Sequence, residues 1–255
     1  MKKTSVSATS FLFTLEAGPE LPTPVPGQFV NVAVSDDLTL RRPFSVAGVP
    51  SPGAFDLLVE MRGRGTRALA ERPVGSSIGV LGPLGNRFTL PAAEGVSLLV
   101  AGGIGVAGLR LLAQELLQGH RRWHALVGAR AADGLLHHML PAPDSDGESI
   151  VAVATDDGSE GLHGTAVDLL KRILDEHDAP ARIYCCGPPA MIAATAEIAA
   201  AREIHCEALL EEMMACGVGA CRGCVVATRS GYKSVCSDGP VFDTSELALE
   251  ELVRA

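Results

Sequence analysis

A cluster of cysteines near the carboxyl end constrains this chain more than any other feature. Four of the seven cysteines lie between positions 216 and 236, separated by four, two and eleven residues. Four thiolates can hold either a tetrahedral zinc ion or a [2Fe-2S] cluster. Cys-x4-Cys-x2-Cys with a distant fourth cysteine is the plant-type ferredoxin spacing, whereas structural zinc sites usually pair two Cys-x2-Cys motifs. We therefore predict a [2Fe-2S] cluster on Cys216, Cys221, Cys224 and Cys236.

Three glycines between these cysteines support the same prediction. Gly217, Gly219 and Gly223 have no side chains, so the loop can adopt positive φ angles and turn its backbone N–H groups toward sulfur atoms. Two alternatives stay open at this point. One is a set of buried, unreactive cysteines, and the other is a zinc-stabilised binding module.

Composition limits the other possibilities. Hydrophobic residues make up 47% of the 255 residues, which is typical of a globular protein, and the net charge of -9 argues against nucleic acid or an anionic membrane as partner. The segment after Met1 lacks a continuous apolar stretch, so we expect a first strand there and not a secretory signal. No run of about 20 apolar residues predicts a membrane span. Thiolate ligands favour a reducing compartment, so we expect a cytoplasmic protein.

The first ninety residues read as short alternating segments broken by glycine and proline. Several short strands at such intervals, with almost no helical periodicity, predict a small antiparallel β-barrel. The predicted strands cover residues 5–15, 28–34, 42–47, 55–61 and 77–81.

The pattern changes near Gly95, where apolar strands begin to alternate with helical segments. Such alternation predicts a parallel sheet with flanking helices. The predicted strands are 96–101, 124–128, 150–154 and 182–186, and the predicted helices are 106–117, 165–174 and 190–201. We expect three parts: a barrel over residues 1–92, an α/β domain over 93–205 and the cysteine-rich module over 206–255.

Two motifs in the first part suit a flavin dinucleotide. A diphosphate needs a fixed guanidinium and free backbone N–H groups, which Arg42 and a glycine-rich turn ending at Gly65 and Thr66 would supply. Phe44 offers an apolar face to an isoalloxazine ring, and Ser45 offers a hydroxyl.

The motifs along the chain resemble those of the ferredoxin-reductase superfamily and occur in the same order. With Glu211-x-x-Met214-x-Cys216 leading into the cysteines, the chain is similar over essentially its whole length to the electron-transfer subunits of NAD-dependent, class 1B dihydroorotate dehydrogenases. The motifs are Arg42-Pro43-Phe44-Ser45, Gly65-Thr66, Leu81–Phe88, Gly102–Val106, Thr155–Ser159 and Cys186-Gly187-Pro188.

The resemblance implies cofactors at particular residues. It places FAD on Arg42, Pro43, Phe44, Ser45, Gly65 and Thr66, with backbone contacts from Leu58, Val59 and Glu60. It places NAD(H) at Gly102, Gly103, Gly105, Gly187 and Pro188, with Cys186 beside the nicotinamide C4.

The adenosine end of the dinucleotide is less defined. Thr155 and Asp157 are candidates to contact it, although Thr-Asp-Asp-Gly-Ser is equally good turn chemistry without a ligand. Arg130 near a 2'-phosphate would favour NADP, whereas the resemblance favours NAD, and the sequence leaves this choice open.

The resemblance also implies a function. The chain would pass electrons from an FMN-containing dihydroorotate dehydrogenase catalytic subunit to NAD, through the cluster and FAD, in pyrimidine biosynthesis. No general base for a carbon substrate is evident, so the partner would carry that chemistry within a heterotetramer, docked on an apolar surface beside Val218 and Ala220. The alternatives are the small subunit of a sulfide dehydrogenase or of a ferredoxin-dependent NADP reductase, and, in another class, the zinc-stabilised module.

Overall fold

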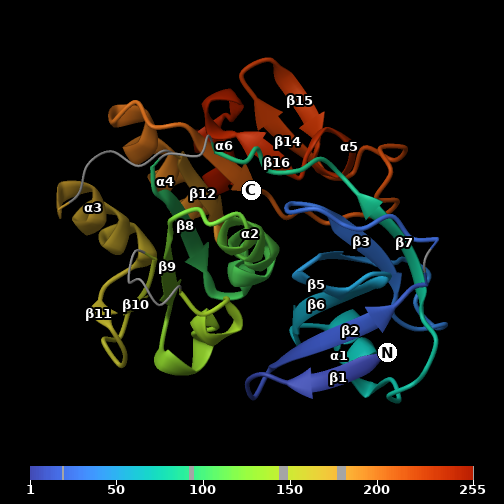
Figure 1. The fold of residues 1–255 in the computed structure, drawn as a ribbon. Coiled ribbons are helices and arrows are strands. Elements are labelled where there is room, and N and C mark those ends of the chain that lie inside the picture. The colour runs from blue at the N-terminus through green and yellow to red at the C-terminus, as the bar shows by residue number, and fades with distance from the viewer. Residues whose placement is uncertain (19, 92–94, 144–148, 177–181, 255) are drawn as a thin grey trace.

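A computed structural model describes residues 1–18, 20–91, 95–143, 149–176 and 182–254. Figure 1 shows antiparallel strands from the first third of the chain on one side and a large sheet with its helices on the other. Helix α2 (Val106–Gln118) lies between them, and the C-terminal segment covers the top of both. Among the described residues, no helix combines the length and apolar character needed to cross a bilayer.

The N-terminal strands form two antiparallel sheets. One has the order β1-β2-β6-β5 and the other the order β4-β3-β7. Apolar side chains such as Phe13, Val30 and Phe55 are fully buried in their shared core. The strands are β1 (Lys2–Ser5), β2 (Ser10–Glu16), β3 (Phe29–Ala33), β4 (Arg42–Ser45), β5 (Gly48–Ser51), β6 (Ala54–Glu60) and β7 (Gly79–Leu84), with α1 (Arg64–Glu71) before β7.

The antiparallel β-barrel that the sequence predicts is not closed in the described chain. The sheets meet along one seam, where the Val46 N–H donates to the Gln28 carbonyl at 3.0 Å and the Ala47 N–H to the Asp56 carbonyl at 2.8 Å. In the described chain, no ladder joins β7 to β1 at the opposite seam. The predicted strand over residues 5–15 is also two strands, because the chain reverses between β1 and β2 and pairs Ser5 with Phe11.

The second half is a seven-stranded sheet with the order β11-β10-β9-β8-β12-β13-β16, parallel except for β16. The predicted alternation of strand and helix is therefore confirmed here. Helix α2 covers the face that looks toward the N-terminal strands, and α3 and α4 cover the other face. The elements are β8 (Ser97–Gly102), β9 (Trp123–Ala129), β10 (Ile150–Thr155), β11 (Leu162–His163), α3 (Ala166–Glu176), β12 (Arg182–Cys186), α4 (Pro189–Ala201), β13 (Cys206–Leu209) and β16 (Val241–Asp243).

The periodicity of α2 explains its central place. Leu109, Leu112 and Leu116 recur at helical spacing and are fully buried against the sheet. This apolar stripe belongs to the core of the second half.

The cysteines lie on an excursion from the edge of the large sheet. Leu209 of β13 pairs with Val241 of β16, and the Leu210 N–H donates to the Pro240 carbonyl at 2.9 Å. Residues 211–239 leave and return between these two strands, and they contain the β14 (Val225–Thr228) and β15 (Gly231–Ser234) hairpin and the short helix α5 (Val235–Asp238). Helix α6 (Leu249–Arg254) ends the described chain.

Two domain boundaries were predicted from the sequence, and only one of them lies within the described residues. The boundary at residue 92 lies outside the described residues. The boundary after residue 205 falls between α4 and β13, so the segment 206–255 supplies two strands of the large sheet as well as the cysteines. The division into three parts stays a prediction.

Candidate functional site

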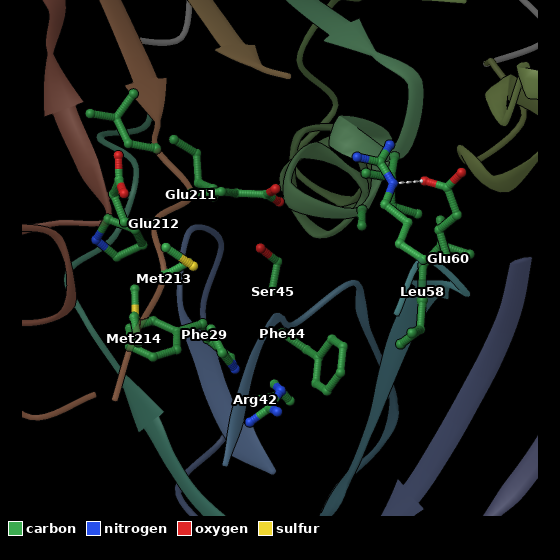
Figure 2. A pocket seen from close by; sticks show the side chains of 18 of the residues that line it. Phe29, Arg42, Phe44, Ser45, Leu58, Glu60, Glu211, Glu212, Met213 and Met214 are labelled. Atoms are coloured by element: carbon green, nitrogen blue, oxygen red, sulfur yellow. Dashed lines mark hydrogen bonds and ion pairs between the residues drawn. The ribbon is translucent and has the colours of Figure 1, made fainter. Parts of the chain in front are cut away.

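A cleft of about 810 Å³ lies where the two halves and the cysteine excursion meet. Its walls come from β4, β6, the start of α2 and the segment that follows β13 (Figure 2). Gly223, between the second and third cysteines of the motif, also lines it. One cavity therefore touches the N-terminal strands, the start of α2 and the cysteine loop.

Strand β4 forms the first wall. Arg42, Pro43, Phe44 and Ser45 all line the cleft, and Figure 2 shows Arg42 and Phe44 on the same side of it. The Arg42 Nη1 donates to the Leu40 carbonyl at 2.6 Å, which fixes one edge of the guanidinium. The same nitrogen also donates to the Arg41 carbonyl at 3.2 Å.

The first turn of α1 abuts this arginine. A Cβ on Gly65 would lie 2.8 Å from Arg42 Nε, so only glycine allows the helix to come this close. Thr66 does not line the cleft; its hydroxyl accepts N–H groups from Arg62 at 2.9 Å and Gly63 at 3.1 Å. Thr66 thus holds the turn that presents the helix N-terminus near Arg42.

Strand β6 forms the opposite wall with Leu58, Val59 and Glu60. The Glu60 carboxylate accepts from Arg62 Nε at 2.6 Å, as the dashed line in Figure 2 marks. Arg62 also lines the cleft and was not among the residues that the sequence singled out.

The glycine-rich turn after β8 borders the cleft from the second half. Ile104 and Ala107 line the cavity, and a Cβ on Gly105 would lie 2.1 Å from the Cys186 carbonyl oxygen. Gly102 packs in the same way against Pro188. The turn and the Cys186-Gly187-Pro188 motif are therefore in direct contact.

The Cys186 sulfur is enclosed in this structure. It is fully buried beneath α2, 2.9 Å from where a Cβ on Gly108 would stand. Burial, together with the negative charge of Glu211, raises the pKa of the Cys186 thiol well above its ordinary value. The thiol is thus neutral and is not part of the cleft wall, and its place beside the nicotinamide C4 stays a prediction.

Thr155 and Asp157 form a closed turn at the end of β10. The buried Thr155 hydroxyl donates to the Glu160 carbonyl at 2.9 Å, and the Asp157 carboxylate accepts from the Ser159 hydroxyl and N–H at 2.6 and 2.9 Å. The two hydrogen bonds from Ser159 lower the pKa of Asp157. Both residues thus have the turn chemistry that the sequence offered as one alternative, and contact with adenosine stays a prediction.

The thiols of the four cysteines influence one another. Interaction with Cys221 helps to lower the pKa of the Cys216 thiol, and interaction with Cys224 helps to raise the pKa of the Cys236 thiol. In the described part of the chain, no three His, Cys, Asp or Glu side chains are grouped to hold a single metal ion. Two thiol pairs match the ligand needs of a two-iron centre, in which each iron takes two thiolates.

Backbone N–H groups point at these sulfur atoms. Val218 and Cys221 donate to Cys216 Sγ at 3.5 and 3.4 Å, and Gly219 donates to Cys236 Sγ at 3.1 Å. The donors lower the pKa of the Cys216 thiol to about 6, whereas burial, followed by the neighbouring Cys224, raises the pKa of Cys236 to about 11. The Cys216 thiol therefore ionises more easily than the Cys236 thiol.

The loop takes part of its shape from the predicted glycines. Gly217 and Gly219 have φ angles of 74° and 79°, as expected for a wrapped loop. The third left-handed residue is Arg222, with φ 53°, and not Gly223. Gly223 instead lines the cleft.

Asn31 of β3 connects the N-terminal strands to the first cysteine of the cluster motif. This asparagine is fully buried, and its Nδ2 donates to the Cys216 carbonyl at 3.2 Å. A Cβ on Gly217 would lie 2.4 Å from the same nitrogen. Sequence reasoning missed Asn31, because a single asparagine in an apolar strand carries no pattern.

The segment after β13 brings further side chains into the cleft. Figure 2 shows Glu211, Glu212, Met213 and Met214 along one side, with the Glu211 carboxylate directed into the cavity. The side chain is accessible through the open cleft, yet the surrounding protein raises the pKa of Glu211, against the opposing charge of Arg62. Glu211 and Met214 were visible in the cysteine motif but had no assigned role.

The cleft and the cysteines fit the implied groups. The cavity volume is within the range of about 300–1,000 Å³ for ligand sites, and it combines apolar walls with a guanidinium suited to a diphosphate. The paired thiols, with N–H groups directed at them, fit an iron–sulfur cluster.

Comparisons with known proteins agree with this geometry. The family described as "Iron-sulfur cluster binding domain of dihydroorotate dehydrogenase B" matches residues 211–248, and the family "Oxidoreductase NAD-binding domain" matches residues 99–197. A solved structure titled "Insights into flavin-based electron bifurcation via the NADH-dependent reduced ferredoxin-NADP oxidoreductase structure" superposes with a TM-score of 0.84 at 28% identity, covering 99% of this chain and 90% of that one. A carbazole 1,9a-dioxygenase ferredoxin reductase, 22% identical with a TM-score of 0.69 over 80% of this chain and 64% of its own, shares the fold.

Curated relatives extend the likeness to the whole chain. The protein of Bacillus caldolyticus named "Dihydroorotate dehydrogenase B (NAD(+)), electron transfer subunit" is 40% identical over 232 residues, covering 88% of this chain and 87% of its own. The protein of the same name from Shouchella clausii is 37% identical, covering 98% and 96%. The chain therefore belongs to the family of dihydroorotate dehydrogenase B electron transfer subunits.

Proposed function

We propose that this chain carries electrons between a dihydroorotate-oxidising catalytic subunit and NAD, with FAD and a [2Fe-2S] cluster as its own cofactors. The observation that carries the proposal is the single cleft bordered by β4, the start of α2 and the cysteine excursion. An electron path needs its centres close together, and this cavity adjoins the flavin-side strands, the nicotinamide-side turn and Gly223 of the cysteine loop.

Different residues in and beside the cleft would bind different parts of FAD and the nicotinamide. Arg42 and the N-terminus of α1 would hold the FAD diphosphate, while Phe44, Ser45 and Leu58 would contact the ring. Gly102, Gly103 and Gly105, with Gly187 and Pro188, would leave room for the nicotinamide. When bound, the flavin exchanges two electrons with a nicotinamide and single electrons with the cluster.

The cysteine excursion would hold the cluster at the protein surface. Cys224 and Cys236 are buried, whereas Cys221 is exposed. Exposed apolar side chains surround this surface, including Met213 at 89% and Val218 at 52%. We expect this face, beside Val218 and Ala220, to dock an FMN-containing catalytic subunit in a heterotetramer.

Co-expression with the partner tests the proposal. The chain would be purified together with a dihydroorotate dehydrogenase catalytic subunit from the same organism, and iron, FAD and NAD reduction by dihydroorotate would be measured. We expect two irons and one FAD per chain, and NAD reduction only when both subunits are present. A colourless protein that contains zinc and no iron would instead indicate the zinc-stabilised module.

The solved bifurcating enzyme favours a second candidate, the small subunit of a ferredoxin-dependent NADP reductase, because that structure covers 99% of this chain. The partner distinguishes the two. Co-purification with a larger flavoprotein, and NADP-dependent ferredoxin turnover, would replace the first proposal with the second.

A further inference from the structure

A buried ion pair crosses the boundary between the two halves of the molecule. Arg110 of α2 places its Nη1 3.2 Å from Asp56 Oδ2 of β6. The same nitrogen donates to the Ala47 carbonyl at 2.8 Å, and Nε donates to the Met139 carbonyl at 2.7 Å. One guanidinium thus binds β6, the link between β4 and β5, and the turn after β9.

Both charges are removed from water. The Arg110 side chain is 14% exposed and the Asp56 side chain 7%. The second Asp56 oxygen accepts the Thr14 hydroxyl at 2.7 Å, so both carboxylate oxygens have a partner. A Cβ on Gly48 would lie 2.3 Å from Arg110 Nη1, so the guanidinium reaches its partners only because position 48 is glycine.

Stability alone does not account for this arrangement. A buried ion pair is roughly neutral compared with well-packed apolar residues of similar volume, because desolvation offsets the attraction. Apolar side chains of both halves, such as Ala47, Leu58 and Leu109, already pack together here. The guanidinium adds directionality, because the N–H groups of its planar fork donate hydrogen bonds at fixed angles.

The ion pair is adjacent to the cleft on both sides. Ala107, one helical turn before Arg110, lines the nicotinamide side, and Leu58, two residues after Asp56, lines the flavin side. Ser45, two residues before Ala47, lines it as well. Any shift of α2 relative to β6 would therefore change the spacing between the two walls.

We propose that Arg110 and Asp56 are positioning residues that set how the nicotinamide meets the flavin. The inference rests on the proposed function, in which hydride passes between FAD and the nicotinamide within this cleft. Hydride transfer requires reacting atoms about 3–3.5 Å apart, and a misplacement of about 1 Å can cost about a hundredfold in rate. Arg110 does not line the cleft, so it acts through the placement of α2 against β4 and β6.

Rapid-mixing kinetics on the assembled complex tests the inference, with bound FAD absorbance followed after addition of saturating NADH. We expect Arg110→Met to slow FAD reduction by about tenfold or more, with FAD and iron contents and the Kd for NADH unchanged. Arg110→Lys, which keeps the charge and one donor direction, should recover part of the rate. Arg172→Met is the matched control, because that arginine pairs with Glu176 on the exposed face of α3.

A second variant covers the case in which a lone buried carboxylate unfolds the protein. The double variant Arg110→Met with Asp56→Leu leaves no unpaired charge, so it should fold and still reduce FAD slowly. Rates within twofold of wild type in either folded variant would overturn the inference while the proposed function stands. A wild-type protein that binds FAD but is not reduced by NADH would overturn the proposed function itself.

Discussion

At the scale of single residues, the cysteine loop depends on contacts that reach across the molecule. Cys216 receives N–H groups from its own loop, while its carbonyl accepts a hydrogen bond from Asn31, which is 185 positions away in the chain. The candidate cluster ligands could be predicted from their spacing, because Cys-x4-Cys-x2-Cys with a distant fourth cysteine is typical of plant-type ferredoxins. Asn31 was not readable, since nothing in a sequence marks which strand residue will meet a distant loop.

Replacing one predicted cluster ligand should stop electron transfer to the partner but not electron transfer between NADH and the flavin. Cys221→Ser should abolish iron binding and transfer to the partner, because a serine hydroxyl stays protonated and a poor ligand. NADH oxidation with an artificial acceptor at the flavin should continue, since Cys221 does not line the cleft. Iron analysis and both assays check this, with Cys206→Ala as a control thiol outside the loop. Loss of both activities would mean that the cysteines chiefly hold the fold.

Asn31→Leu should weaken the cluster without disturbing the flavin. The substitution keeps a similar volume but removes the hydrogen bond to the Cys216 carbonyl. Outer contacts of this kind affect metal affinity by about tenfold or more, so a chelator should remove iron correspondingly faster. Iron release is followed by loss of visible circular dichroism, and the FAD content is the internal reference. Release at the wild-type rate would show that Asn31 has no such effect.

At the scale of elements, a helix or strand could be predicted from the sequence where contacts between neighbouring residues determine it. Helix α3 begins where Thr165 and Asp168 cap each other: the Thr165 N–H donates to Asp168 Oδ2 at 3.0 Å, and the Asp168 N–H to the Thr165 hydroxyl at 3.2 Å. The strand predicted over residues 5–15 failed because alternation continues through the β1–β2 turn, where Ser7 caps the reversal by accepting the Ser10 N–H at 3.1 Å.

Removing this cap should lower stability by a constant amount at ordinary pH. Asp168→Ala should cost about 1 kcal/mol and lower Tm by about 2–4 °C. Hydrogen bonds from Thr165 lower the pKa of Asp168 below 3.8, so the contribution is lost only as pH falls through that lowered pKa. Thermal unfolding between about pH 8 and 5 should therefore give the same difference throughout. A difference that shrinks at pH 5 would contradict the assignment.

At the scale of the whole molecule, the order of strands and helices in the second half could be predicted from the sequence, but not how they join the rest of the chain. The alternation of β8 to α4 predicted the large sheet, because each parallel strand needs a crossover helix. The predicted barrel is not closed in the described chain, because closure depends on whether distant edge strands pair, and local alternation does not specify that pairing. The cleft too is a product of assembly: β4, β6, α2 and the segment after β13 meet only in the folded chain.

Removing the cluster should leave most of the molecule intact. The large sheet is held by ladders that include β13 and β16, so iron chelation should preserve it. Hydrogen exchange should rise chiefly over residues 213–236, where the backbone N–H groups of Val218, Gly219 and Cys221 donate to sulfur. Mass spectrometry of exchange in loaded and iron-free protein measures this. Increased exchange throughout β8 and β12 would instead make the cluster a condition for folding.

The pairing of Leu209 with Val241 has a consequence for how such a protein is built. The cysteine excursion leaves the large sheet after β13 and rejoins it at the neighbouring strand β16, so the two ends of the excursion lie side by side. Lengthening or exchanging it leaves the strands beneath in register. A protein of this architecture can thus gain or replace the cysteine loop without changes to the strands and the helix that line the cleft.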